Sequence, residues 1–69
     1  NFTNDEMNLM CIYDTGNRAG LINALSEMRK ELSMDEIELL DLTDSTLNKL
    51  SAMSDEDYAK LELYPDFDE

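Results

Sequence analysis

The sequence predicts a small all-α fold, a bundle of three main helices followed by a short fourth helix and an acidic C-terminal tail. Three observations predict it. Helix-start patterns recur near residues 4, 34 and 55, and apolar side chains follow helical spacing between them. No alternating strand pattern or Asn-Gly hairpin turn occurs. A chain of 69 residues can hold only one domain, expected over residues 1–63, with the tail at 64–69.

The helix starts rest on a capping-box pattern, in which a hydroxyl residue is followed three positions later by an acid. The three pairs are Thr3 with Glu6, Ser33 with Glu36, and Ser54 with Asp57. In each copy, an apolar residue before the cap can contact an apolar residue at the fourth helical position. Three such coincidences indicate three helix N-termini.

Helix one is expected from Asn4 to Asp14, with Met7, Met10 and Cys11 on one face. Leu9, Ile12 and Tyr13 broaden that face, so the sequence favours this helix as the central one. The segment 15–17 then predicts a turn, because Gly16 suits the residue after a helix end.

Helix two is expected from Arg18 to Leu32. Its apolar stripe has spacings of four, three and four and consists of Leu21, Leu25, Met28 and Leu32. Gly20 near the start of this helix suggests that a neighbouring helix approaches closely.

Helix three is expected from Met34 to about Met53. Its core positions are Ile37, Leu40, Leu47 and Leu50. The stretch 43–46 is polar and weakly helical, which leaves open a kink or a split. Helix four is expected from Asp55 to Leu63, with Tyr58 and Leu61 facing inward, and Pro65 ends it.

The net charge of the chain restricts the kind of molecule that it can bind. The net charge is −12, of which −2 lies in residues 1–33 and −10 in residues 34–69. Such a surface repels phosphate, which disfavours direct binding to nucleic acid or to a membrane of anionic lipid, and it attracts a basic protein. The alternative is that the acids only keep a small domain soluble.

The residues for catalysis or metal binding are largely missing, so we expect no enzyme, no cofactor and no metal site. The chain has no His, one Cys and two Gly. Cys11 is expected to pack in an apolar face, away from the helix N-terminus that would activate a thiol. The triplet Asp14-Thr15-Gly16 resembles an aspartic-protease signature, but it occurs once, and a helix end with a Gly stop is favoured.

A cytoplasmic location is expected, because the chain shows no disulfide framework, no signal peptide and no apolar run of membrane-spanning length. The candidate partner-contact residues are aromatic, basic or acidic, namely Tyr13, Arg18, Tyr64, Asp66, Phe67 and Asp68. The alternatives are that Tyr13 fills the core, that Arg18 is a solvated charge, and that the tail packs on the core.

The segment Cys11-Ile12-Tyr13-Asp14-Thr15-Gly16, with Arg18 and Leu21-Ile22, and the end Tyr64-Pro65-Asp66-Phe67-Asp68-Glu69 carry a family resemblance. The chain resembles, over essentially its whole length, the transposon-transfer assisting family, small proteins encoded in conjugative elements of Firmicutes. The resemblance implies a helical fold and a role in transfer of the element. It implies no catalytic residues.

Two functions therefore stay open. The first is an interaction module, a monomer or weak homodimer, that binds a basic protein of the element's transfer or regulatory machinery. The second is an acidic DNA mimic that inhibits a DNA-binding or restriction protein. A mimic needs carboxylates in two rows at phosphate-like spacing, whereas an interaction module needs an apolar patch with an acidic rim.

Overall fold

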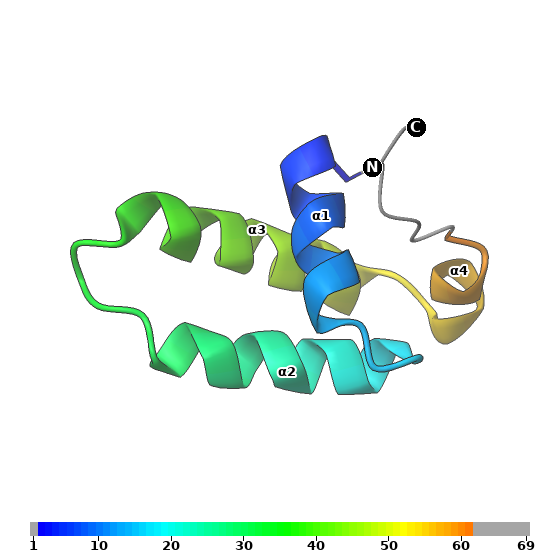
Figure 1. The fold of residues 1–69 in the computed structure, drawn as a ribbon. Helices are drawn as coiled ribbons and strands as arrows, with labels where there is room; N and C mark the ends of the chain where they lie inside the picture. Colours follow the sequence, from blue (N-terminus) through cyan, green and yellow to red (C-terminus); the bar gives the residue numbers. More distant parts are fainter. Residues whose placement is uncertain (1, 62–69) are drawn as a thin grey trace.

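The computed structural model describes residues 2–61, which form four helices and no strand. These are α1 (Asn4–Tyr13), α2 (Arg18–Lys30), α3 (Ile37–Ala52) and α4 (Asp55–Ala59). The long helices α2 and α3 run antiparallel as a hairpin, α1 lies across them, and α4 follows the C-terminal end of α3 (Figure 1). This confirms the all-α fold of three main helices and a short fourth.

The core lies where the three main helices meet. Its buried apolar residues come from all four helices and are Leu9, Met10, Leu21, Leu25, Leu50 and Tyr58. The most extensive contacts join α2 to α3, and those of α1 with α3 come next. The expectation that helix one is central is therefore wrong, and α3 is the helix at the centre of the packing. Ile12 explains why, since 73% of its surface is exposed and the apolar circumference of α1 is only partly covered.

The first capping box is complete. The backbone N–H of Thr3 donates to Glu6 Oε1 at 2.8 Å, and the N–H of Glu6 donates to Thr3 Oγ1 at 3.1 Å. At the start of α4, Ser54 Oγ accepts a hydrogen bond from the N–H of Asp57 at 3.0 Å. Both helices therefore begin where the sequence predicts.

The turn before α2 is held by its own polar side chains. Asn17 caps the helix, because its Oδ1 accepts a hydrogen bond from the N–H of Gly20 at 2.6 Å. Gly16 has a φ of 103°, a conformation that favours glycine, so the predicted turn is confirmed. A Cβ at Gly20 would collide with the Thr15 hydroxyl, so the close approach comes from this turn and not from a neighbouring helix.

The expected start of helix three at Met34 is wrong, because α3 begins at Ile37. Ser33 Oγ does not accept the Glu36 N–H. It donates to Asp35 Oδ1 at 2.5 Å and to Glu36 Oε1 at 3.1 Å. The residue at the helix boundary is Glu36, which makes no side-chain cap bond. As a result Ile37, an expected core residue, is 60% exposed.

The polar stretch 43–46 does not split α3, and two of its four residues are buried. The helix is continuous from Ile37 to Ala52, and Thr43 and Thr46 are fully buried. The Thr46 hydroxyl donates to the carbonyl oxygen of Leu42 at 2.8 Å, which satisfies it within the helix. Two short polar side chains thus lie on the buried side of the helix.

All four helices end earlier than predicted, α1 and α3 by one residue and α2 and α4 by more. α2 ends at Lys30, where the N–H groups of Glu31 and Leu32 donate to carbonyl oxygens three residues back, at 2.9 and 3.2 Å. α4 ends at Ala59 for the same reason, with bonds of 3.1 and 3.0 Å from Lys60 and Leu61. Such bonds tighten the last turn and stop the helix. Residues 62–63, where helix four was expected to continue, lie outside the described residues.

Candidate interaction surface

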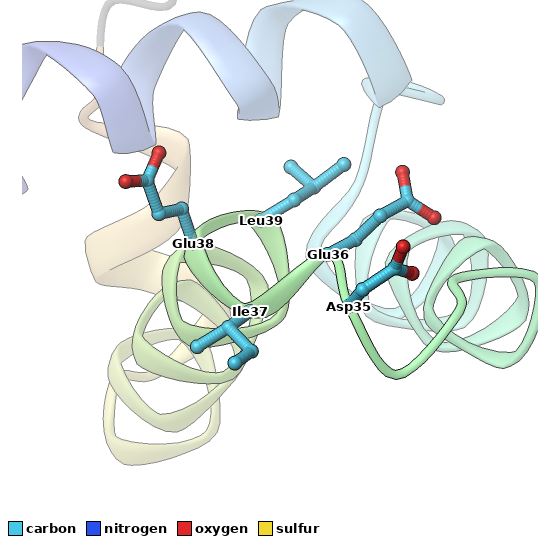
Figure 2. A pocket seen from close by; sticks show the side chains of 5 residues that line it. All are labelled: Asp35, Glu36, Ile37, Glu38 and Leu39. Carbon is cyan, nitrogen blue, oxygen red and sulfur yellow. The ribbon is translucent and has the colours of Figure 1, made fainter.

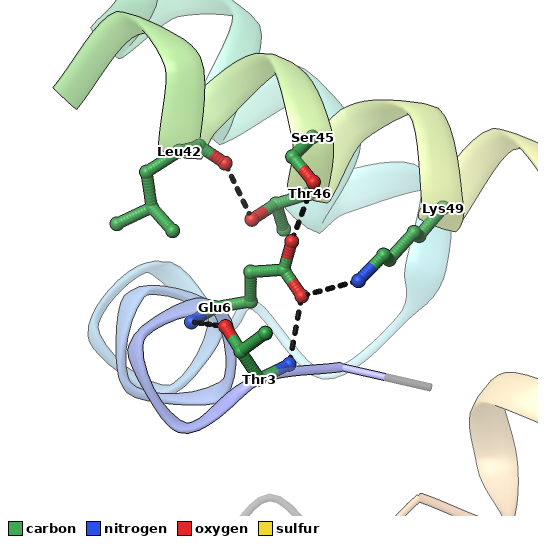
Figure 3. Close-up of polar contacts among 6 residues, drawn as sticks. All are labelled: Thr3, Glu6, Leu42, Ser45, Thr46 and Lys49. Carbon is green, nitrogen blue, oxygen red and sulfur yellow. Dashed lines mark hydrogen bonds and ion pairs between the residues drawn. The ribbon is translucent and has the colours of Figure 1, made fainter. Parts of the chain in front are cut away.

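The buried carboxylate of Glu6 joins α1 to α3 (Figure 3). Only 2% of this residue is exposed, yet both carboxylate oxygens have donors. Oε1 accepts from Lys49 Nζ at 2.7 Å and from the Thr3 N–H, and Oε2 accepts from Ser45 Oγ at 2.6 Å. Burial by itself raises the pKa of Glu6, but the hydrogen bonds from Lys49, Ser45 and Thr3 outweigh it and lower the pKa to about 2.

This cluster is suited to holding the fold together and not to moving protons. A carboxylate with such a low pKa and this many donors is a poor base at neutral pH. Lys49 also lies over the Phe2 ring, 5.7 Å from its centroid, which places the N-terminal segment against α3.

The Asp14-Thr15-Gly16 triplet forms a junction between α1 and α4. Asp14 Oδ1 accepts hydrogen bonds from the N–H of Gly16 and from the Tyr58 hydroxyl, both at 2.9 Å. Burial, together with this bond to Asp14, raises the pKa of Tyr58 to about 12. The interpretation of the triplet as a helix end is supported, because its carboxylate meets a phenol and a backbone amide.

Arg18 lies at a second junction. Its Nε donates to Asp55 Oδ1 at 2.7 Å, and its Nη1 donates to the carbonyl oxygen of Leu50 at 2.9 Å. The guanidinium thus connects the start of α2 with the end of α3 and the start of α4. Tyr13, the other described partner candidate, is half-buried against the core. The candidates Tyr64, Asp66, Phe67 and Asp68 lie outside the described residues, and the partner role of all six stays a prediction.

Most of the Arg and Lys side chains form ion pairs. In residues 2–61, Arg18 pairs with Asp55, Arg29 with Asp44, Lys30 with Glu27, and Lys49 with Glu6, which accounts for four of the five bases of the chain. The other nine acids of this part are all exposed, namely Asp5, Asp14, Glu31, Asp35, Glu36, Glu38, Asp41, Glu56 and Asp57. The surface of residues 2–61 therefore carries an excess of negative charge.

Two large apolar side chains are exposed near several of these acids in the sequence, one in the connection between α2 and α3 and one at the first residue of α3. Met34 is 90% exposed and Ile37 is 60% exposed. A shallow open hollow is lined by residues 35–39, and in Figure 2 the carboxylates of Asp35 and Glu36 lie side by side while Ile37 points to another side of the helix. We call Met34 and Ile37, with the acids Glu31, Asp35, Glu36 and Glu38, the connection surface.

The connection surface was not predicted from the sequence, because the capping pattern and apolar spacing placed Met34 inside a helix and Ile37 in the core.

In residues 2–61, no helix is long and apolar enough to cross a membrane. The same residues contain no group of three or more acidic or Cys side chains placed to hold a metal ion.

The sequence matches the family model described as "Putative transposon-transfer assisting protein" over residues 2–65. The match spans nearly the whole chain, and the chain belongs to this family. No curated protein and no solved structure matches it.

Proposed function

We propose that this member of the transposon-transfer assisting family is a non-enzymatic accessory protein that acts by binding a basic protein of the transfer or regulatory machinery. The family supports the role in transfer. The use of charge supports the basic partner, since four of the five bases are in ion pairs while nine acids are exposed. An excess of exposed carboxylates steers a basic surface into contact and repels DNA phosphate.

The absence of enzymatic activity is supported by the state of the reactive groups. Glu6, the buried carboxylate, is saturated by donors from Thr3, Ser45 and Lys49. The thiol of Cys11 lies in the second half of α1, away from the positive end of the helix that would activate it. The chain has no His that could serve as a general base.

The proposal is tested by capture from a donor cell during transfer. The tagged protein is cross-linked in a host that carries the element, and the captured proteins are identified against a tag-only control. We expect a basic protein encoded by the element to be enriched, and the complex isolated without cross-linking to dissociate as salt rises, because salt screens exposed charges. Deleting the gene should lower the transfer frequency. Capture without any basic element-encoded protein would contradict the proposal.

The DNA-mimic alternative gives a different result in the same experiment. The captured protein would be a DNA-binding or restriction protein, and duplex DNA would displace it from the complex.

A further inference from the structure

We infer that α4 is a lid over the last turn of α1, and that it opens by itself while α1, α2 and α3 remain folded. This opening needs no partner and is independent of the proposed function. Only one of the five side chains of α4 is buried, that of Tyr58. The other four residues are exposed, namely Asp55, Glu56, Asp57 and Ala59.

The length of α4 makes its helical form depend on contacts with the rest of the domain. Five residues are far fewer than the roughly 12 to 15 that an isolated helix needs to be stable in water. α4 follows α3 through residues 53 and 54 and lies beyond the end of the hairpin at which α2 begins and α3 ends (Figure 1). When its contacts break, docking and helical structure are therefore lost together.

Two polar junctions hold the lid closed. The Tyr58 hydroxyl donates to Asp14 Oδ1 at 2.9 Å. The Arg18 guanidinium donates to Asp55 Oδ1 at 2.7 Å and to the carbonyl oxygen of Leu50 at 2.9 Å. Apolar contact comes from Tyr58 and from the partly buried Leu61 that follows α4.

The bonds among the three main helices are separate from these junctions. Arg29 pairs with Asp44 between α2 and α3, and Lys49 pairs with Glu6 between α3 and α1. Both pairs stay intact when α4 opens, because neither includes a residue of α4. Local opening of this kind is expected of an element with few buried apolar contacts.

The lid covers Cys11. This residue lies one turn before Asp14, so both are on the same side of the end of α1. Burial, the bond to Asp14 and the negative charges of Asp14 and of the Cys11 thiolate raise the pKa of Tyr58 to about 12, which indicates that thiol and phenol are close. Cys11 is half-buried and is the only thiol of the chain, so its reactivity reports the opening.

The opening is tested on the full chain by the rate at which Cys11 reacts with a coloured aromatic disulfide. We expect this rate to be at least about tenfold below that of the urea-unfolded chain. It should change less than about twofold between no urea and about 1.5 M urea, a range in which the equilibrium constant for global unfolding rises about tenfold. A rate that rises in step with global unfolding, or that equals the rate of the unfolded chain, would overturn the inference.

Matched variants show which bonds control the lid. Arg18→Gln should raise the labelling rate about tenfold, and Tyr58→Phe should raise it about fivefold, because each removes a bond that exists only when α4 is closed. Arg29→Gln removes an ion pair that the open form keeps, so it should lower the urea midpoint and change the labelling rate less than about twofold. Equal acceleration by Arg18→Gln and Arg29→Gln would mean that only global unfolding exposes Cys11.

Amide hydrogen exchange gives a second readout that does not use the thiol. The backbone N–H groups of Tyr58, Lys60 and Leu61 donate to carbonyl oxygens within or beside α4 at 2.9, 3.1 and 3.0 Å. We expect these three amides to be at least about tenfold less protected than amides in the middle of α2 and α3. Equal protection would show that α4 opens only when the whole domain unfolds, and the lid would be wrong.

Discussion

Thr3 to Glu6 and Ser33 to Glu36 carry the same local pattern, yet the two segments lie in opposite environments. In the first, hydroxyl and carboxylate cap each other's backbone, and Glu6 is buried against Ser45 and Lys49. In the second, the Ser33 hydroxyl donates to two carboxylates, and Glu36 remains exposed.

The difference shows that hydrogen bonds from another helix accompany the capping box that forms and are missing from the one that does not. Glu6 has partners from α3, 39 and 43 residues away, that hold its carboxylate in place. Glu36 has none from another helix among the described residues, and the Ser33 hydroxyl donates to Asp35 without capping the helix. One copy therefore anchors a helix, and the other forms a turn that exposes its apolar neighbours.

The largest expected difference in stability is between neutralising Glu6 and neutralising Glu36. Glu6→Gln should lower the free energy of unfolding by about 3 kcal/mol, because it leaves Lys49 and the other donors with a weaker acceptor in a buried site. Glu36→Gln, at the surface, should change it by less than about 0.5 kcal/mol. Urea unfolding midpoints measure both, and similar shifts would remove the distinction between the two segments.

Low pH should remove the stabilisation that the Glu6 carboxylate gives to the fold. The pKa of Glu6 falls from 4.5 to about 2 on folding, so its stabilisation is fully present above pH 4.5 and is lost as pH falls towards 2. We expect about 2 to 3 kcal/mol to be lost in this range. The difference in unfolding free energy between the parent and Glu6→Gln isolates this loss from the relief of repulsion among the other acids. A difference that stays constant from pH 6 to pH 2.5 would argue against the buried carboxylate.

The third capping pattern, at Ser54, begins the helix that contains the buried Tyr58. We expect Tyr58 to make the stability of the fold depend on alkaline pH. The pKa of Tyr58 rises from 10 to about 12 on folding, so its contribution is fully present below pH 10 and is lost as pH rises towards 12. The expected loss is about 2 kcal/mol or less. Tyr58→Phe should cost about 1 kcal/mol at neutral pH through the lost bond to Asp14 and should flatten the alkaline loss. Thermal melts between pH 8 and pH 11 test this, and parallel curves for the two proteins would contradict it.

The smallest effects compare the cap hydroxyls. Thr3→Ala should destabilise the fold by about 1 kcal/mol, because it removes an acceptor for the Glu6 N–H. Ser33→Ala should cost less than about 0.5 kcal/mol, because it removes only exposed bonds to carboxylates. Denaturant midpoints decide between them, and a larger loss at Ser33 would show that the second box caps α3 in solution.

The sequence was sufficient for the fold class and for two of the three capping-box starts, because periodicity and caps depend on neighbouring residues. It was insufficient where contacts between residues far apart in the sequence determine which side chains are buried. Thr43 and Thr46 are fully buried in a continuous helix, whereas the polarity of the stretch left open a kink or a split. Met34 and Ile37 are exposed beside a turn in which the Ser33 hydroxyl donates to Asp35 and Glu36 and does not cap the helix, and the capping pattern does not predict this turn.

Only part of the candidate site could be predicted from the sequence. Charge distribution predicted an acidic partner-binding surface, but it could not say which bases are consumed in ion pairs. Arg18 was picked as a contact residue from its type, and the structure places its guanidinium between Asp55 and the Leu50 carbonyl. Its two partners lie 37 and 32 residues away, at a separation that local pattern does not report.

The junctions that close the bundle also imply an order of assembly. The α2–α3 hairpin needs only a short connection, and its pair Arg29–Asp44 spans 15 residues. The bonds from Glu6 to Lys49 and from Asp14 to Tyr58 span 43 and 44 residues. Since closing a longer loop costs more chain entropy, α1 and α4 are expected to dock onto a hairpin that has already formed. The turn that carries Met34 would then be complete early, before the two ends of the domain are sealed together.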